Sequence, residues 1–375
     1  MVREKNVYQD LKAENRNRVF HRIREAGRIS SPSLSYELKL SRPTVKQNLD
    51  ELLGLGYIYE NGFEGHTGGR RARTYSVRAS ARSAIGMDIT RNHIMVTAAD
   101  LCGNLIYEKR VRAPFSLNTE YRKLLGRLAG EAAAAARTGA EGILGVGIAV
   151  PGLVTEDHQR ISYGKILDFT GATADILGES IPWPCRLYND ADAGGYAEIS
   201  ENSQLRDAFY ISLSNNIGGA ILIDHKVYKG EGARSGEIGH MTLIPGGRPC
   251  YCGKTGCFEA YCNASLLSAH SGGDLELFFA KTAQGDPKCV QVWEEYLDYL
   301  AIAVNNIRML FDCPVILGGY VGACMEPYLD RLRMLALARN PFDRNADFLV
   351  ACQVKREALA FGAALPFVHE FWKNI

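Results

Sequence analysis

Residues 239–259, GHMTLIPGGRPCYCGKTGCFE, gather one histidine and three cysteines in a single short segment. A tetrahedral zinc site takes four donors of this type, and the segment supplies them as His240, Cys250, Cys252 and Cys257. The glycines between the cysteines suit the tight turns of such a knuckle. The alternative is a set of ordinary buried thiols. Because four protein ligands leave no position for a reactive water, we expect a structural zinc ion.

The cysteine count and the absence of long apolar runs indicate an intracellular setting. Ten cysteines are spread over 375 residues, whereas a disulfide scaffold would be shorter and richer in cysteine. No run of about 18 apolar residues exists, and the first residues, MVREKNVYQD, lack an apolar signal region. We therefore expect a cytoplasmic protein of two or three domains with no membrane association.

The net charge of +1 conceals an uneven distribution along the chain. Residues 1–82 contain 16 basic and 9 acidic side chains, a balance of +7, and the remainder carries −6. A basic segment attached to an acidic body suggests that the segment alone meets a polyanion. Ordinary solvated surface charge is the alternative.

The same basic segment has the pattern of a helix-turn-helix. Residues 14–26 place apolar side chains at helical spacing, and residues 31–40 read as a short helix with Ser31 as its N-cap. Ser41 caps a third helix that ends at Gly54 or Gly56. Two helices separated by a short break form the helix-turn-helix motif.

The third predicted helix begins with side chains of the kinds that contact DNA bases and phosphates. Its candidate DNA-binding residues are Arg42, Thr44, Lys46 and Gln47, in the half that would enter the major groove. A three-helix packing domain without DNA function is the alternative.

Residues 57–77 follow as two short strands about a polar turn, a wing. Within this turn, Arg70 and Arg71 are candidates for contact with a narrow minor groove. A flexible, solvated linker is the alternative.

From Ala84 onward strands and helices mix, which predicts an α/β body with lobes around a cleft. We expect strands at 84–89, 93–101, 104–112, 142–150, 186–190, 208–214, 218–224 and 313–319. Helices are expected near 119–137, through much of 258–310 and after Lys355. The predicted organisation is a winged helix-turn-helix domain at 1–78, a linker at 79–83 and the α/β body at 84–375.

Four motifs in this body resemble the ROK family of repressors, open reading frames and sugar kinases. They are VPG at 150–152, NDAD at 189–192, GEIGH at 236–240 and CYCGKTGCFE at 250–259. The N-terminal helix-turn-helix resembles that of the family's transcriptional regulators. The resemblance implies an actin-like, hexokinase-type fold, with lobe one at about 84–188 plus the C-terminal helix 356–375 and lobe two at about 189–355.

The resemblance also implies a sugar site made of Gly152, Asn189, Asp190, Glu237, His240 and Glu259. Ionised carboxylates suit a polyol because each accepts hydrogen bonds from two hydroxyls. His240 would bind zinc through one ring nitrogen and turn the other toward the sugar, so that zinc shapes the sugar site.

The phosphate loops depart from those of the family's kinases. Those kinases have D-x-G-G-T where this chain has residues 88–92, DITRN, and glycine-threonine-glycine where it has residues 212–216, SLSNN. Only glycine lets backbone amides approach a triphosphate closely. We therefore expect no bound ATP, and Asp190 would be a catalytic base only if the chain were a kinase.

Together these features predict a sugar-responsive, DNA-binding transcriptional regulator that represses carbohydrate-use genes through a degenerate kinase domain. Its expected partners are double-stranded operator DNA, a small sugar and a second copy of itself, as a homodimer or higher oligomer. One alternative is an active ATP-dependent sugar kinase with an appended DNA-binding domain. Another is a zinc-stabilised interaction module without a small ligand.

Overall fold

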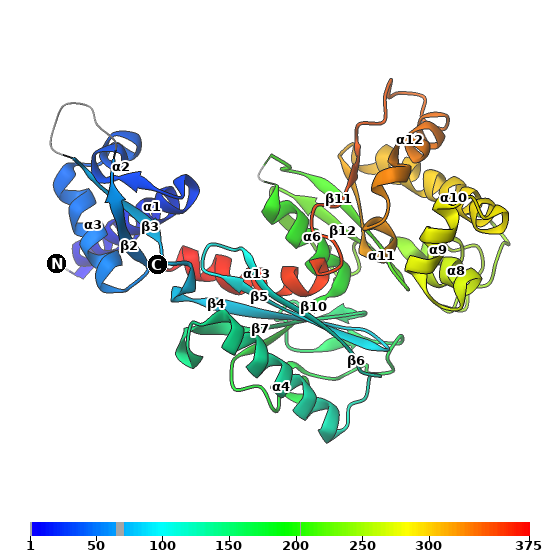
Figure 1. Ribbon diagram of the computed structural model, residues 1–375, viewed down its shortest axis with the longest axis horizontal. Helices are drawn as coiled ribbons and strands as arrows, with labels where there is room; N and C mark the ends of the chain where they lie inside the picture. The colour runs from blue at the N-terminus through cyan, green and yellow to red at the C-terminus, as the bar shows by residue number, and fades with distance from the viewer. Residues whose placement is uncertain (1, 65–70, 203) are drawn as a thin grey trace.

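The computed structural model describes residues 2–64, 71–202 and 204–375, and it divides the chain into a small N-terminal domain and two larger lobes (Figure 1). The N-terminal domain stands at one end of the molecule, beside the C-terminus. Its elements are α1 (Val2–Ala26), β1 (Ile29–Ser30), α2 (Ser31–Leu38), α3 (Arg42–Gly54), β2 (Ile58–Phe63) and β3 (Arg73–Val77).

The helix-turn-helix forms as predicted, with one cap displaced. The Ser41 side chain accepts a hydrogen bond from the backbone N–H of Thr44 at 3.2 Å and caps α3, which ends at Gly54. The cap of α2 is Ser30, not Ser31, because Ser30 has the extended backbone that a cap requires and Ser31 is already helical.

The apolar side of α1 forms the core of the N-terminal domain. Val19, Phe20 and Ile23 are fully buried against Leu34 of α2 and Leu49 of α3. Each such side chain contributes roughly 1.5–3 kcal/mol when it leaves water. The predicted wing is confirmed as the antiparallel pair β2–β3. The strand β1 pairs with β3 as well, and its two residues are too few to show the alternation of a strand in the sequence.

The described residues of the first lobe form a five-stranded sheet with strand order β10-β7-β4-β5-β6. Its strands are β4 (Ser83–Ile89), β5 (His93–Asp100), β6 (Leu105–Arg112), β7 (Ile143–Val150) and β10 (Cys185–Asn189). Helix α4 (Thr119–Ala136) covers one face, and α13 (Ala358–Lys373) covers the other (Figure 1). The short elements β8 (Leu153–Val154), β9 (Ile161–Tyr163) and α5 (Ala174–Leu177) connect β7 to β10.

Helix α13 lies unusually close to the first sheet. A Cβ atom on Gly86 would lie 1.8 Å from the carbonyl oxygen of Ala360, and one on Gly147 would lie 1.9 Å from that of Ala363. Both strand positions therefore require glycine, because the backbone of α13 rests directly on β4 and β7.

The described part of the second lobe holds another five-stranded sheet, with order β13-β12-β11-β14-β15. Its strands are β11 (Ala208–Leu213), β12 (Ile217–Ile223), β13 (Lys226–Tyr228), β14 (Val315–Gly318) and β15 (Leu349–Ala351). The helices of this lobe are α6 (Asp190–Glu201), α7 (Glu259–Cys262), α8 (Ala264–Ser268), α9 (Leu275–Ala283), α10 (Pro287–Phe311), α11 (Gly319–Gly322) and α12 (Leu329–Leu337).

Helices α6 and α10 lie on opposite faces of the second sheet. Phe209 and Ile211 of β11 point into the core with α10, whereas Tyr210 packs with Ile199 of α6. Helix α6 also packs against α13, where a Cβ atom on Gly362 would lie 1.8 Å from the carbonyl oxygen of Ala193. The strands and helices predicted from Ala84 onward are confirmed, within a residue or two at their ends.

The end of α13 joins the first lobe to the N-terminal domain. The amide of Asn17 donates a hydrogen bond to the carbonyl oxygen of Lys373 at 2.7 Å. The rings of Tyr57 and Phe371 meet edge to face at 5.2 Å between centroids. No helix within the described ranges is both long enough and apolar enough to span a membrane.

Candidate functional site

The histidine and the three cysteines of the knuckle converge on one point. Two isolated β-bridges, Thr242 with Cys257 and Pro249 with Thr255, fold the segment back on itself. Glycine is required at residue 256, where φ is +80° and a Cβ atom would lie 1.9 Å from a carbonyl oxygen. One ligand atom from each of the four side chains lies within 4.8 Å of all the others.

These spacings fit a tetrahedral metal ion. The Sγ atoms of Cys252 and Cys257 are 3.8 Å apart, and Cys250 Sγ lies 3.8 Å from His240 Nδ1. A zinc ion with Zn–S bonds of about 2.3 Å separates neighbouring sulfurs by about 3.8 Å. The knuckle can therefore hold a metal ion through His240, Cys250, Cys252 and Cys257.

The second ring nitrogen of His240 meets a tyrosine that the sequence reading did not single out. His240 Nε2 lies 3.3 Å from the hydroxyl oxygen of Tyr251. Tyr251 lies between Cys250 and Cys252, where no helical or strand periodicity indicates the direction of its side chain. A sugar that reaches Nε2 would have to take the place of this hydroxyl, so the sugar-facing role of His240 stays a prediction.

Asn189 fixes the start of α6 next to the loop of Gly152. Its side-chain oxygen accepts from the backbone N–H of Asp192 at 3.0 Å, and its amide nitrogen donates to the Gly152 carbonyl at 3.1 Å. One side chain thus caps the helix of the second lobe and holds a loop of the first. Asp190 follows, with its Oδ1 accepting from the backbone N–H of Ala191 at 2.8 Å.

Three carboxyl groups from separate segments influence one another electrostatically. Burial, with a contribution from the charge of Glu237, raises the pKa of Asp190 to about 7, and the hydrogen bond from the Ala191 N–H opposes this rise. Burial likewise raises the pKa of Glu237. Burial raises the pKa of Glu259 to about 7 as well, with the charge of Asp190 adding to it. Asp190 of α6 is therefore close enough to Glu237, in the loop before His240, and to Glu259 of α7 for charge to act between the members of each pair.

Backbone and side-chain contacts complete this site. The buried Glu259 accepts from the backbone N–H of Ile217 at 2.6 Å and from the Asn216 amide at 3.4 Å. The Lys165 ammonium donates to the carbonyl oxygen of Tyr251 at 3.1 Å, which ties the first lobe to the knuckle. The sequence does not predict this contact of Lys165, just as it does not predict the role of Tyr251, because the two residues are 86 positions apart.

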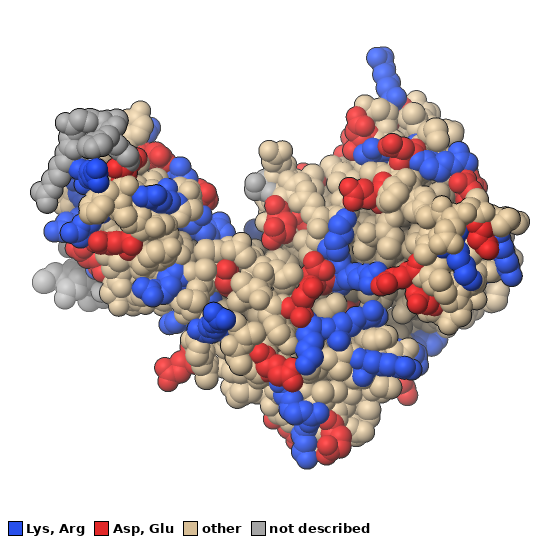
Figure 2. All heavy atoms as spheres, viewed as in Figure 1, with Lys and Arg blue, Asp and Glu red and all other residues tan. Residues whose placement is uncertain are grey.

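A separate cavity of about 650 Å³ lies between the lobes, at the segments that correspond to phosphate loops. Its walls include residues 90–93 and 272–276, together with Arg110, Arg112 and Arg356. Figure 2 shows basic and acidic side chains mixed along the boundary between the lobes.

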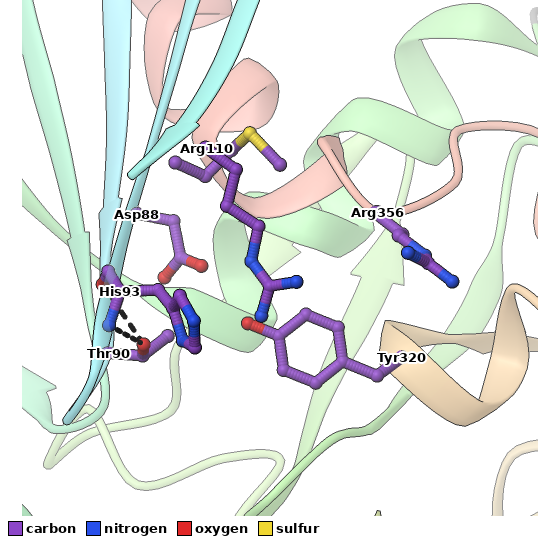
Figure 3. A pocket seen from close by; sticks show the side chains of 7 residues that line it. Asp88, Thr90, His93, Arg110, Tyr320 and Arg356 are labelled. Carbon is purple, nitrogen blue, oxygen red and sulfur yellow. Dashed lines mark hydrogen bonds between the residues drawn. The ribbon is translucent and has the colours of Figure 1, made fainter. Parts of the chain in front are cut away.

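Side chains fill the space around Asp88. Arg110 reaches from β6 toward Asp88 and Tyr320, with its guanidinium carbon 5.6 Å from the Tyr320 ring centroid (Figure 3). The remaining space beside Asp88 is only about 10 Å³, roughly the room for one water molecule. Thr90 and His93 close the adjoining turn through two hydrogen bonds of 3.0 and 3.1 Å.

The carboxyl group of Asp88 is buried and only partly satisfied. Its Oδ1 has no hydrogen-bond partner among the residues that the structure describes. Burial, with a contribution from the charge of Asp190, raises its pKa to about 8, and the charge of Arg110 opposes this rise. Asp88 therefore carries a proton at neutral pH.

The candidate DNA-binding side chains of α3 lie on its outer surface. Arg42, Lys46 and Gln47 are exposed, while Val45 and Leu49 point into the core. Figure 2 shows basic side chains distributed over the N-terminal domain. Thr44 is half-buried, and its hydroxyl lies 2.8 Å from that of Ser41, so it takes part in the helix cap. Arg71 precedes β3, and Arg70 lies outside the described residues.

These features define a class of protein in which a helix-turn-helix domain is attached to a two-lobed, kinase-type fold with a cysteine knuckle. The ROK family model matches residues 84–369, and the chain belongs to the ROK family.

The chain is 29% identical over 355 residues to a putative xylose repressor of Caldicellulosiruptor sp. strain Rt8B.4, a match that covers 88% of each protein. It is also 29% identical to the xylose repressor of Caldicellulosiruptor bescii, over 68% of this chain and 65% of that protein. An N-acetylmannosamine kinase of Escherichia coli O157:H7 is 32% identical over 50% of this chain and 66% of the kinase.

The fold matches a solved ROK family transcriptional regulator, described as a homologue of the E. coli MLC protein. The TM-score is 0.72 at 21% identity, and the match covers 97% of each chain. The predicted architecture, a helix-turn-helix domain followed by a hexokinase-type ROK domain, is thereby confirmed.

Proposed function

We propose that this protein is a sugar-responsive transcriptional repressor. One observation carries the proposal: the chain combines an exposed recognition helix with a ROK domain in which Arg110 and Tyr320 reduce the space beside Asp88 to about 10 Å³. The relatives named xylose repressors support it, since one of them matches over 88% of both chains.

Within this proposal the knuckle binds a structural zinc ion through His240, Cys250, Cys252 and Cys257. The donor set of three thiolates and one imidazole, with spacings of 3.8 Å, supports zinc over harder metals. The zinc would fix His240 and the chain that leads into Glu259.

The sugar would bind at the convergence of the two lobes and the knuckle. The proposed contacts are Gly152, Asn189, Asp190, Glu237, His240 and Glu259. Their carboxyl groups already influence one another, so a polyol entering among them would replace mutual repulsion with hydrogen bonds. Xylose is the first sugar to test because of the named relatives.

The DNA-reading residues would lie in a domain of residues 1–78. We assign Arg42, Lys46, Gln47, Arg70 and Arg71 to direct contacts, and Thr44 to a contact made together with its capping role. Operators read by a helix-turn-helix are usually two half-sites, which favours a homodimer or higher oligomer.

We infer that the ROK domain senses sugar without phosphorylating it. A transferable phosphate needs backbone amides around it, and the space beside Asp88 is filled by side chains. The rival function is an ATP-dependent sugar kinase, favoured by the match to N-acetylmannosamine kinase over half the chain.

Thermal unfolding of the purified protein with xylose, glucose and N-acetylmannosamine tests the proposal. A sugar at 100 times its dissociation constant should raise the free energy of unfolding by about 2.7 kcal/mol. A coupled assay with ATP and the same sugars should show no ADP formation. ADP formation would establish the kinase instead, and the absence of a shift with every sugar would exclude a sugar sensor.

A further inference from the structure

A cavity of about 440 Å³ opens between α6 and α13, bordered by β10 and β13. This volume falls within the range of small-molecule sites, about 300–1,000 Å³. Asp192 lines it from α6. Because Asp192 lies two residues after Asp190, the two carboxyl groups point about 200° apart around the helix. None of the residues proposed for the sugar is among the described residues that line it.

Aromatic rings form the walls of this cavity. The rings of His158 and Tyr188 lie 4.6 Å apart between centroids, and the Tyr196 hydroxyl lies 2.6 Å from His369 Nδ1. Burial, with the charges of Arg24 and Lys373, lowers the pKa of His369 to about 4, so this ring is neutral. Flat rings of this kind stack on planar unsaturated groups.

Cationic side chains outnumber the carboxylates around the cavity. Arg186 is paired with Glu370 at 2.5 Å. The ammonium groups of Lys226, Lys229 and Lys373 have no ion-pair partner within the described parts of the chain. The opposing group is Asp192, whose pKa burial raises to about 7 while Lys229 lowers it. The cavity therefore has a positive balance that only an anion would neutralise.

We propose that this cavity is a second effector site, which binds a small planar organic acid. The unsaturated body of the acid would lie against Tyr188 and Tyr196, and its carboxylate or phosphate group would meet Lys226 and Lys229.

The cavity lies between a helix of the proposed sugar site and a helix that contacts the N-terminal domain. One wall is α6, which begins with Asp190. The other wall is α13, whose Lys373 carbonyl accepts a hydrogen bond from Asn17 of the N-terminal domain. An occupant would contact the helix of the sugar site and the helix that meets the DNA-binding domain.

Isothermal titration of the full chain with 2-naphthoate tests the site. The wild type should bind it, and the double variant Lys226→Ala, Lys229→Ala should bind at least 10-fold more weakly. Val227→Trp should abolish binding by filling the cavity without removing a charge. Lys288→Ala, an exposed lysine of α10 outside the cavity, is the matched control and should bind as the wild type does.

Related probes separate the contributions of ring and charge. 2-Naphthalenemethanol, with the same rings and no charge, and inorganic phosphate, with charge and no ring, should each bind at least 10-fold more weakly than 2-naphthoate. Comparison with 2-naphthyl phosphate identifies the preferred acid group. Failure of the wild type to bind either acid, equal binding of the alcohol, equal binding of phosphate or an unchanged double variant would overturn the proposal. Thermal unfolding confirms that each variant is folded.

Discussion

The guanidinium carbon of Arg24 lies 3.7 Å from the centroid of the Trp372 ring. This contact joins the first helix of the DNA-binding domain to the last helix of the ROK domain. Trp372 is itself anchored, since its indole N–H donates to the carbonyl oxygen of Leu101 at 2.8 Å. A movement of the first lobe together with α13 would therefore be transmitted to the domain that reads DNA.

Replacement of Arg24 should weaken this transmission. Arg24→Ala should bind sugar and operator normally but lose about 2- to 30-fold of the effect of sugar on operator affinity, because a cation–π contact is worth about 0.5–2 kcal/mol. Operator titration with and without saturating sugar measures the effect. Arg127→Ala, an exposed arginine of α4, is the control. A full sugar response in Arg24→Ala would show that the contact carries no signal.

Loss of a knuckle cysteine should cost both metal and sugar binding. Cys252→Ser removes one of the four donors, and a structural zinc site contributes on the order of 10 kcal/mol to its local fold. Metal content and sugar affinity should fall together, whereas Cys102→Ser, outside the knuckle, should leave both unchanged. A zinc-free Cys252→Ser that binds sugar with wild-type affinity would separate the metal from the sugar site.

Two neighbouring residues of α3 should affect DNA binding in different ways. Lys46→Ala should weaken binding to all sequences and lower the salt slope by about 1, because a phosphate contact is lost. Gln47→Ala should relax the preference for the operator over other DNA. Fluorescence anisotropy at several salt concentrations distinguishes the two effects. If the double variant keeps wild-type operator affinity, α3 is not the recognition helix.

Asp88 should make the protein less stable as the pH rises. Its pKa is about 8 in the folded protein and near 3.8 when exposed, so the folded state keeps a proton that the unfolded chain loses. The stability contribution is complete below about pH 4 and disappears as the pH rises through about 8. Asp88→Asn lacks this dependence.

The difference between wild type and Asp88→Asn is measured by denaturant unfolding at pH 5.5 and pH 8.5. The wild type should lose several kcal/mol more than the variant, since one pKa unit corresponds to about 1.4 kcal/mol. Carboxyl groups other than Asp190, whose charge acts on Asp88, titrate equally in both proteins and cancel in the comparison. Equal losses in the two proteins would mean that Asp88 ionises normally.

Local patterns predicted most of the fold and the knuckle. Ser41 was identified as a cap from its neighbours alone, and the spacing of His240 and the cysteines is contained within 18 residues. The cap of α2 was displaced by one residue because Ser30 and Ser31 are chemically identical, and only the backbone distinguishes them. The same locality explains why the sequence predicts all five strands of the first sheet.

Contacts between distant segments were not predictable. Asn17 and Lys373 are 356 residues apart, and no periodicity connects them. The filling of the space beside Asp88 by Arg110 and Tyr320 depends on two side chains from different lobes. The missing glycines at residues 88–92 indicate a degenerate phosphate loop. The side chains that occupy the space beside Asp88 are identified only by the fold.

We propose that sugar binding and operator binding are coupled through one conformational change. Asp190→Asn should keep its backbone hydrogen bond to Ala191 while losing a charged acceptor, so it should bind operator normally and respond poorly to sugar. By reciprocity, operator DNA must weaken sugar binding by the same factor as sugar weakens operator binding.

Operator titration of the wild type and Asp190→Asn, with and without saturating sugar, is the most direct test. The wild-type operator affinity should fall about 5- to 150-fold when sugar is bound, and the variant should change far less at the same sugar concentration. Superimposable wild-type isotherms with sugar demonstrably bound would contradict the account.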